Sequence, residues 1–170
     1  LCGFSSCTND SSRRLNIDVA KIEIPNFEIE RYEQDLFSLD TLHFLSGLHK
    51  IQNAYSVFLG LDELNTENTQ ALYNYITDPK LITLNNEVKQ IYTSISFLEK
   101  ELKTAFQHYL HYYPKAKVPL IYTYISGLQF ESPVQLSAET MVIGLDLYLG
   151  ADFKEYKILG LPAYKSARMT

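Results

Sequence analysis

Residues 139–150 read ETMVIGLDLYLG, and apolar residues alternate with other residues along this stretch. One face of the alternation carries Met141, Ile143, Leu145, Leu147 and Leu149. The other face carries Val142, Gly144, Asp146 and Tyr148. A period of two sustained over nine residues predicts a half-buried strand at 141–149.

A second strand is predicted upstream, where residues 118–127 read VPLIYTYISG. β-branched and aromatic residues occupy both of its faces, which is typical of a strand buried on both sides. Gly127 allows a turn or a bulge at its end. The polar connection at 130–139 is short enough for an antiparallel pair, and it can hold a small strand of its own around Val134–Leu136.

Helical periodicity precedes these strands. Over residues 40–60 the apolar residues step by four, three, four and three, at Phe44, Leu48, Ile51, Tyr55 and Phe58. This spacing predicts one amphipathic helix that begins at Asp40 or Thr41 and stops at Gly60. A second helix is predicted over 66–76, capped by Thr66 and ended before Asp78-Pro79.

The most extended helical pattern covers residues 85–113. Its apolar face consists of Val88, Ile91, Ile95, Leu98, Leu102, Phe106, Tyr109 and Tyr113. One long helix is predicted there, ending at Tyr113 because Pro114 follows. Residues 17–31 alternate only in part and contain Pro25, so they predict an edge strand or an extended lead-in before a helical region at 31–37.

Helices followed by a small antiparallel sheet predict an α+β fold, in a single domain over residues 17–170. Apolar residues make up 46% of the chain, with 13 Tyr and 9 Phe, which is enough for a core. The net charge of −5 and the lack of a basic stretch argue against nucleic-acid binding. No apolar run reaches the roughly 18 residues that a membrane-spanning helix needs.

We expect the sequence to be truncated at both ends, since it begins with Leu1 rather than Met and ends in LPAYKSARMT without a helix cap or a polar tail. The first residues, LCGFSSC, resemble the end of a bacterial lipoprotein signal peptide. Residues 1–6 are therefore predicted to be removed, Cys7 to be lipidated, and 7–16 to form a flexible tether. The alternatives are an unmodified Cys7, a Cys2–Cys7 disulfide, half of a metal site, and lipidation at Cys2 instead.

Among groups that could carry chemistry, His108 and His111 are three apart on the predicted long helix. They could approach a metal, or they could be surface residues that suit the helix dipole. His43 and His49 do not share a helix face. No HExxH, GxSxG, Walker or GxGxxG motif is present, so no catalytic, metal or cofactor-binding residue and no cofactor are predicted in residues 1–170.

Two further groups leave alternatives open. Asp146 and Tyr148 could face a substrate or a cation from their strand, or they could belong to a solvated face followed by a turn at Gly150–Asp152. A set of tyrosines could form an aromatic binding surface or the boundary of the core; its members are Tyr109, Tyr112, Tyr113, Tyr122 and Tyr124.

Several stretches, taken in order, match one family. They are ERYEQDLF at 30–37, TDPKL at 77–81, HYYPKAKVPLIYTYISG at 111–127, MVIGLDLYLGADFKEY at 141–156 and LPAYKSARM at 161–169. Together they resemble the gliding motility-associated lipoproteins, the GldB family of the Bacteroidota, over residues 17–170. The family's lipidated cysteine falls on Cys7.

The resemblance implies a lipoprotein of the cell envelope, connected with gliding and the linked protein-secretion apparatus. It also implies a zinc-peptidase-like scaffold and further residues after Thr170. The first hypothesis is a membrane-anchored protein, not an enzyme, that binds other envelope proteins. The alternative is a zinc-dependent hydrolase with metal ligands beyond residue 170, in which the strand Met141–Leu149 is the sheet edge that aligns the substrate.

Overall fold

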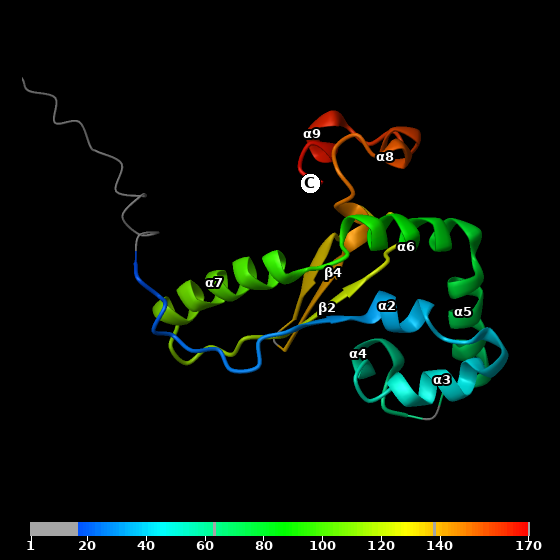
Figure 1. Cartoon of the computed structure of the whole chain (residues 1–170), viewed down its shortest axis with the longest axis horizontal. Helices are drawn as coiled ribbons and strands as arrows, with labels where there is room; N and C mark the ends of the chain where they lie inside the picture. Colours follow the sequence, from blue (N-terminus) through cyan, green and yellow to red (C-terminus); the bar gives the residue numbers. More distant parts are fainter. Residues whose placement is uncertain (1–16, 63, 138, 170) are drawn as a thin grey trace, which may run out of the picture. The chain divides into compact units, whose positions relative to one another are not determined.

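A computed structural model of the chain describes residues 17–62, 64–137 and 139–169 (Figure 1). These residues form two compact units. The α7 unit combines the segment up to Phe27 with Ser96–Val118, and the sheet unit combines Glu28–Ile95 with Pro119–Thr170. The described residues contain helices and a mixed sheet, so the predicted α+β class is confirmed.

The sheet has four strands: β1 (Ile29–Arg31), β2 (Leu120–Tyr124), β3 (Val134–Leu136) and β4 (Thr140–Gly144). Their order is β1-β2-β4-β3. The strand predicted around Val134–Leu136 is therefore present, and β1 is an edge strand that follows the lead-in at 17–28.

The predicted antiparallel sheet is wrong, because β2 runs parallel to both β1 and β4, and β3 alone pairs antiparallel, with β4. A parallel neighbour needs a crossover connection. Residues 125–139 supply it: the chain passes beyond the position of β4, forms β3, and turns back into β4. β4 is consequently an internal strand. The prediction that the strand starting at Met141 forms the edge of the sheet is therefore wrong.

The predicted nine-residue strand ends at Gly144, because the chain then forms the 3-10 helix η2 (Leu145–Leu147). Gly144 lies close to the end of β2, since a Cβ atom placed on it would stand 3.2 Å from the Ser126 Cβ atom. A larger residue would push these two strand ends apart. Because η2 turns away from the strand direction, the alternation of faces no longer applies beyond Gly144.

Between β1 and β2 the sheet unit is mostly helical. Its elements are α2 (Tyr32–Phe37), η1 (Thr41–His43), α3 (Phe44–Ile51), α4 (Ser56–Leu59), α5 (Thr66–Thr77) and α6 (Pro79–Ile91). The helical region predicted at 31–37 and the helix predicted at 66–76 are confirmed, but the second helix is capped by Asn65, whose side chain accepts from the Asn68 N–H, and not by Thr66 as predicted. The single helix predicted over 40–60 is divided into η1, α3 and α4, although Asp40 does cap its start and Gly60, with φ +72°, does end it.

The long helix predicted over 85–113 is also wrong. Its first part belongs to α6, which starts earlier because Asp78 accepts hydrogen bonds from the Lys80 and Leu81 N–H groups and Pro79 opens the first turn. The helix stops at Tyr92, whose carbonyl accepts a hydrogen bond from Arg31 Nη1 at 2.6 Å. Thr93 and Ser94 follow, residue types that compete with helical hydrogen bonds, and α7 (Ser96–Tyr112) then begins.

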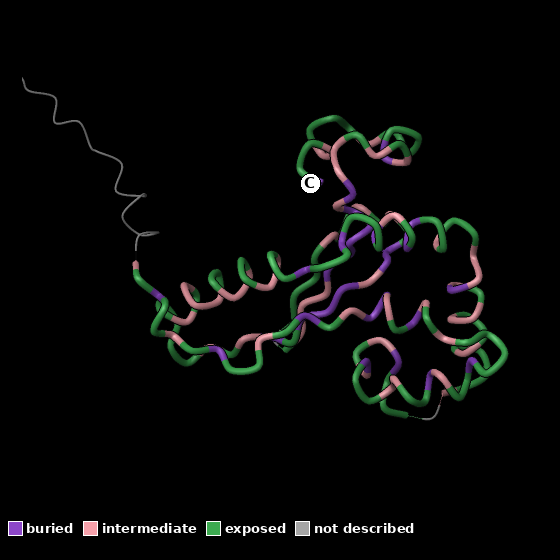
Figure 2. The backbone as a smooth tube through the Cα atoms, viewed as in Figure 1, coloured by how far each residue is buried: buried purple, intermediate pink, exposed green. Residues whose placement is uncertain are grey.

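The core of the sheet unit lies where α2 to α5 pack against β2. Its buried members are Tyr32, Leu36, Phe44, Leu48, Tyr55, Leu59, Ile76 and Tyr122. Figure 2 shows buried positions running along the strands and α2. At the other end of this unit, α8 (Lys154–Ile158) and α9 (Ala163–Ser166) follow η2.

In the α7 unit the lead-in segment packs along α7. The Gln107 Nε2 atom donates a hydrogen bond to the Ile22 carbonyl at 2.7 Å, and the Phe27 and Phe106 rings lie 6.1 Å apart. None of the helices built from the described residues combines the length and the apolar character that crossing a membrane requires.

Candidate functional site

Three parallel strands end at the same edge of the sheet. Tyr32 follows β1, Ile125 and Ser126 follow β2, and Leu145 and Asp146 follow β4. In open sheets with parallel strands, ligands bind beyond the carboxyl ends of the strands. The edge of the sheet at which β1, β2 and β4 end is therefore a candidate site.

Asp146 is the central polar residue at this edge, and its side chain is fully buried. Oδ1 accepts a hydrogen bond from the Ser126 N–H at 2.7 Å. Oδ2 accepts hydrogen bonds from the Ser126 hydroxyl at 2.9 Å and the Leu128 N–H at 2.7 Å. The prediction that Asp146 belongs to a solvated face is wrong, because η2 turns this side chain inward against the end of β2.

The pKa of the Asp146 carboxyl is raised, because burial disfavours its charged form, while the hydrogen bonds from Ser126 and Leu128 act in the opposite direction. The backbone of η2 is fixed by the buried Tyr156. Its hydroxyl donates to the Asp146 carbonyl at 2.8 Å and accepts from the Leu149 N–H at 3.0 Å. The turn predicted at Gly150 is present, since Gly150 has φ +100° and accepts from the Phe153 N–H.

The loop after β2 has an uncommon backbone. Gly127 and Leu128 both have positive φ, at +69° and +65°. The predicted turn at Gly127 is confirmed, and Leu128 adopts a conformation that costs a residue with a Cβ atom roughly 1–2 kcal/mol. Since the Leu128 N–H points to Asp146 Oδ2, the buried carboxylate stabilises the strained residue. The Tyr75 hydroxyl donates to the Ile125 carbonyl and fixes the other end of the loop.

A cavity of about 510 Å³ lies beside this loop, within the sheet unit. Tyr124, Ser126 and Gln129 line it from β2 and the loop after this strand, and Tyr32 lines it from the start of α2. Helices α2, α4 and α5 and the segment between α4 and α5 provide the rest, with Leu36, Phe58, Leu64 and Leu72 among its apolar residues. Sequence reasoning missed this cavity, because residues distant in the chain form it.

A second buried polar cluster lies around Glu33. Arg31 Nε donates to Glu33 Oε1 at 2.7 Å, and the Thr123 hydroxyl donates to Glu33 Oε2 at 2.7 Å. Arg31 Nη1 continues to the Tyr92 carbonyl. The cluster joins the end of β1, the middle of β2 and the end of α6, so it connects segments that are far apart in the sequence.

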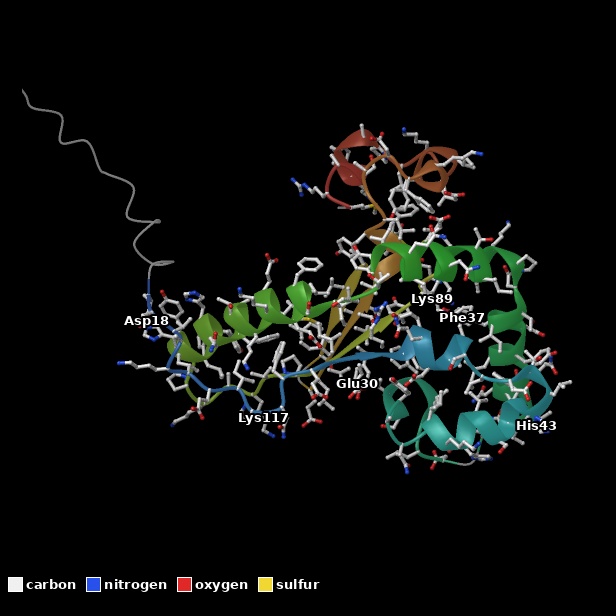
Figure 3. The ribbon with its side chains drawn as sticks, viewed as in Figure 1. Asp18, Glu30, Phe37, His43, Lys89 and Lys117 are labelled. Atoms are coloured by element: carbon white, nitrogen blue, oxygen red, sulfur yellow. The ribbon has the colours of Figure 1, made fainter. Side chains whose placement is uncertain are left out.

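The histidines do not assemble a site. His43 Nδ1 lies 2.7 Å from Asp40 Oδ2 at the exposed start of α3, where Figure 3 labels it. His49 lies in α3, and His108 and His111 share α7. Within residues 17–62, 64–137 and 139–169, no group of three His, Cys, Asp or Glu side chains is arranged to hold a metal ion.

The five tyrosines singled out from the sequence divide between the two units. Tyr109, Tyr112 and Tyr113 belong to the α7 unit and are exposed. Tyr122 is buried in the core of the sheet unit, with its ring 5.8 Å from that of Phe58, and Tyr124 lines the cavity. Tyr122 therefore fits the core alternative, and Cys7 lies outside the described residues.

Comparison with known proteins relates this chain to one protein family. A family model described as gliding motility protein GldB matches residues 12–170, which agrees with the resemblance noted in the sequence. Comparisons with curated proteins and with solved structures gave no match. The zinc-peptidase-like scaffold and the hydrolase with metal ligands beyond residue 170 stay predictions.

Proposed function

This chain belongs to the GldB family of gliding motility lipoproteins, and from that membership we propose that it is a lipid-anchored protein of the cell envelope that acts by binding other proteins. The proposed partners are envelope proteins of the motility and linked secretion machinery. The match over residues 12–170 is the observation that carries the proposal.

The proposed anchor is Cys7. Residues 1–6 are the end of a signal peptide that is removed, residues 7–16 form the tether, and 17–170 form the domain that the tether holds at the membrane. The support is LCGFSSC, in which small residues precede the cysteine, followed by the polar TNDSSRR. Each buried CH₂ of an acyl chain contributes about 0.8 kcal/mol, so two or more chains anchor a protein stably.

Binding of a protein partner is supported by apolar side chains that stay exposed around α8 and α9. Ile158, Leu159 and Tyr164 are 70%, 50% and 67% exposed. Exposed large apolar side chains are candidates for contact with a partner, and three of them lie close together in the sequence here. We propose that residues 158–164 contribute to the contact with the partner.

The anchor is tested by expressing the full-length protein in a bacterial host and feeding the cells an alkyne-tagged palmitate. Wild type and Cys2→Ala are expected to be labelled and to sediment with membranes. Cys7→Ala is expected to lose the label and the sedimentation. A labelled, membrane-bound Cys7→Ala protein would overturn the anchor, and loss of label from Cys2→Ala would transfer it to Cys2.

The binding surface is tested separately with a photo-crosslinking residue placed at Tyr164. The matched control carries it at Lys89, an exposed position on α6 that Figure 3 labels. An adduct with an envelope protein is expected at Tyr164 and not at Lys89. The same adduct pattern at both positions would contradict the proposed surface.

A further inference from the structure

We propose that the cavity beside the loop after β2 binds an uncharged, mainly apolar small molecule that carries a hydrogen-bond acceptor, and that the Tyr32 hydroxyl donates to that acceptor. The volume of about 510 Å³ falls within the range of roughly 300–1,000 Å³ that is usual for small-molecule sites. The position at the carboxyl ends of β1 and β2 is one at which such sites occur.

The residues around the cavity define the chemical class of the ligand. Leucine and aromatic side chains form most of the wall. The described residues that line it include no Lys, Arg, His, Asp or Glu. Burying a charge without a partner costs far more than burying an apolar group. The polar side chains of Asn68 and Gln129 are neutral and suit a carbonyl, hydroxyl or amide on the ligand. The Ser126 hydroxyl already donates its proton to Asp146, so it could only accept from a ligand.

Tyr32 is the second observation that points to a ligand. Its side chain lines the cavity and is 5% exposed, and its hydroxyl has no hydrogen-bond partner among the described residues. A buried polar group without a partner costs about 1–3 kcal/mol, which a ligand acceptor would recover. The oxygen is covered by its neighbours, so the side chains around it have to shift before a ligand acceptor can reach it.

The wall is held in place before any ligand binds. Phe58 stacks on Tyr32 with ring centroids 4.2 Å apart and planes 3° from parallel. On the sheet side, Asp146 holds Ser126, and Tyr75 holds the Ile125 carbonyl. These contacts hold most of the wall in place, so only the side chains that cover the Tyr32 hydroxyl have to move on binding, which limits the conformational freedom that is lost. This site does not depend on the lipid anchor or on a protein partner.

The test is a fluorescence titration of the full-length protein with prodan, an uncharged naphthyl dye whose ketone accepts a hydrogen bond. Saturable binding at one site per chain is expected. The anionic dye 8-anilinonaphthalene-1-sulfonate is expected to bind at least about tenfold more weakly, because no cation meets its sulfonate. Non-saturable binding of prodan, or tighter binding of the anionic dye, would overturn the proposal.

Three variants locate the site. Ala71→Trp places a large ring on the α5 wall at an exposed position and is expected to weaken prodan binding at least about tenfold. Ala105→Trp is the matched control, because Ala105 is exposed on α7 in the other unit, and its affinity should equal that of wild type.

Tyr32→Phe is expected to weaken prodan binding about three- to tenfold while leaving the melting temperature unchanged or higher, because the lost hydroxyl had no partner. Wild-type affinity in Ala71→Trp would overturn the location of the site. Wild-type affinity in Tyr32→Phe would overturn the role of the hydroxyl.

Discussion

Glu33 and Asp146 are both carboxylates with buried side chains in the sheet unit, yet their surroundings differ in one respect. Glu33 has a charged partner, Arg31, as well as the Thr123 hydroxyl. Asp146 accepts hydrogen bonds from neutral groups only, at Ser126 and Leu128. One cluster compensates its charge, and the other disperses it over backbone and hydroxyl dipoles.

The difference indicates what each carboxylate does. The ion pair connects the ends of β1 and α6 to β2, and we expect the joint exchange of both charged residues for apolar ones to cost less than the loss of one of them. Asp146 determines a local backbone conformation, because two of its three donors are backbone N–H groups, which every substitution except proline leaves in place. Asp146 has no charged partner among the residues that the structure describes. A second substitution therefore cannot compensate for the loss of its carboxylate, as the exchange of Arg31 could for the loss of Glu33.

The largest expected effect breaks the charged cluster. Glu33→Leu leaves the Arg31 guanidinium buried without its carboxylate, and we expect it to lower the free energy of unfolding by about 3–5 kcal/mol. The double variant Arg31→Met/Glu33→Leu should lose clearly less, because no charge remains unpaired. Chemical denaturation measures both. A double variant that loses as much stability as Glu33→Leu alone would contradict the compensation.

Asp146→Asn comes next. An amide has one acceptor oxygen, so in either orientation its NH₂ group would face a donor: the Ser126 N–H on one side, or the Leu128 N–H and the Ser126 hydroxyl on the other. We expect a loss of about 2–3 kcal/mol in denaturant unfolding, because a buried donor is left unsatisfied. Asp152→Asn is the matched control, since its ion pair with Lys157 is exposed and its removal should be without measurable effect.

Ser126→Ala tests the one donor among the three that is a side-chain group. It removes the hydroxyl that donates to Asp146 Oδ2 and accepts from the Gln129 N–H, and it keeps the Ser126 N–H bond to Oδ1. A loss of about 1–2 kcal/mol is expected, because both hydrogen bonds of the hydroxyl are lost. Thermal unfolding measures it. A loss as large as that of Asp146→Asn would mean that the hydroxyl, rather than the backbone, anchors the carboxylate.

The smallest expected effect is a difference in the pH dependence of the free energy of unfolding between wild type and Asp146→Asn. The pKa of Asp146 is raised in the folded state, mainly by burial. The contribution of Asp146 to the free energy of unfolding is therefore fully present below the unfolded-state pKa of about 3.9. It is lost as the pH rises through the higher folded-state pKa. The stability difference between wild type and Asp146→Asn should accordingly shrink as the pH rises over that window. A difference that grows with pH would contradict the direction of the shift.

The elements that sequence patterns predicted best are those set by local signals. The strand at Val134–Leu136, the helix at 66–76, the cap at Asp40 and the turn at Gly127 all depend on neighbouring residues. The start of α6 was within reach as well, since Asp78-Pro79 is a typical cap and first-turn pair. The break at Tyr92 was not, because the hydrogen bond that ends the helix comes from Arg31, far along the chain.

The candidate site was harder to predict for the same reason. Alternation at 141–149 placed Asp146 on an open face, but the pattern contains no information on where a strand turns into η2. The three donors of Asp146 lie at Ser126 and Leu128, in a loop that the parallel pairing of β2 and β4 brings close. The parallel pairing itself was missed, because a short connection containing β3 resembles a hairpin link.

Amide hydrogen exchange at Ser126 and Leu128, compared between wild type and Asp146→Asn, tests most directly whether the buried carboxylate holds the loop beside the cavity. We expect both amides to be protected in wild type and to lose at least about tenfold of that protection in the variant. The Ile121 and Thr123 amides, within β2, should keep theirs. Equal protection of Ser126 and Leu128 in the two proteins would show that the loop keeps its conformation without Asp146.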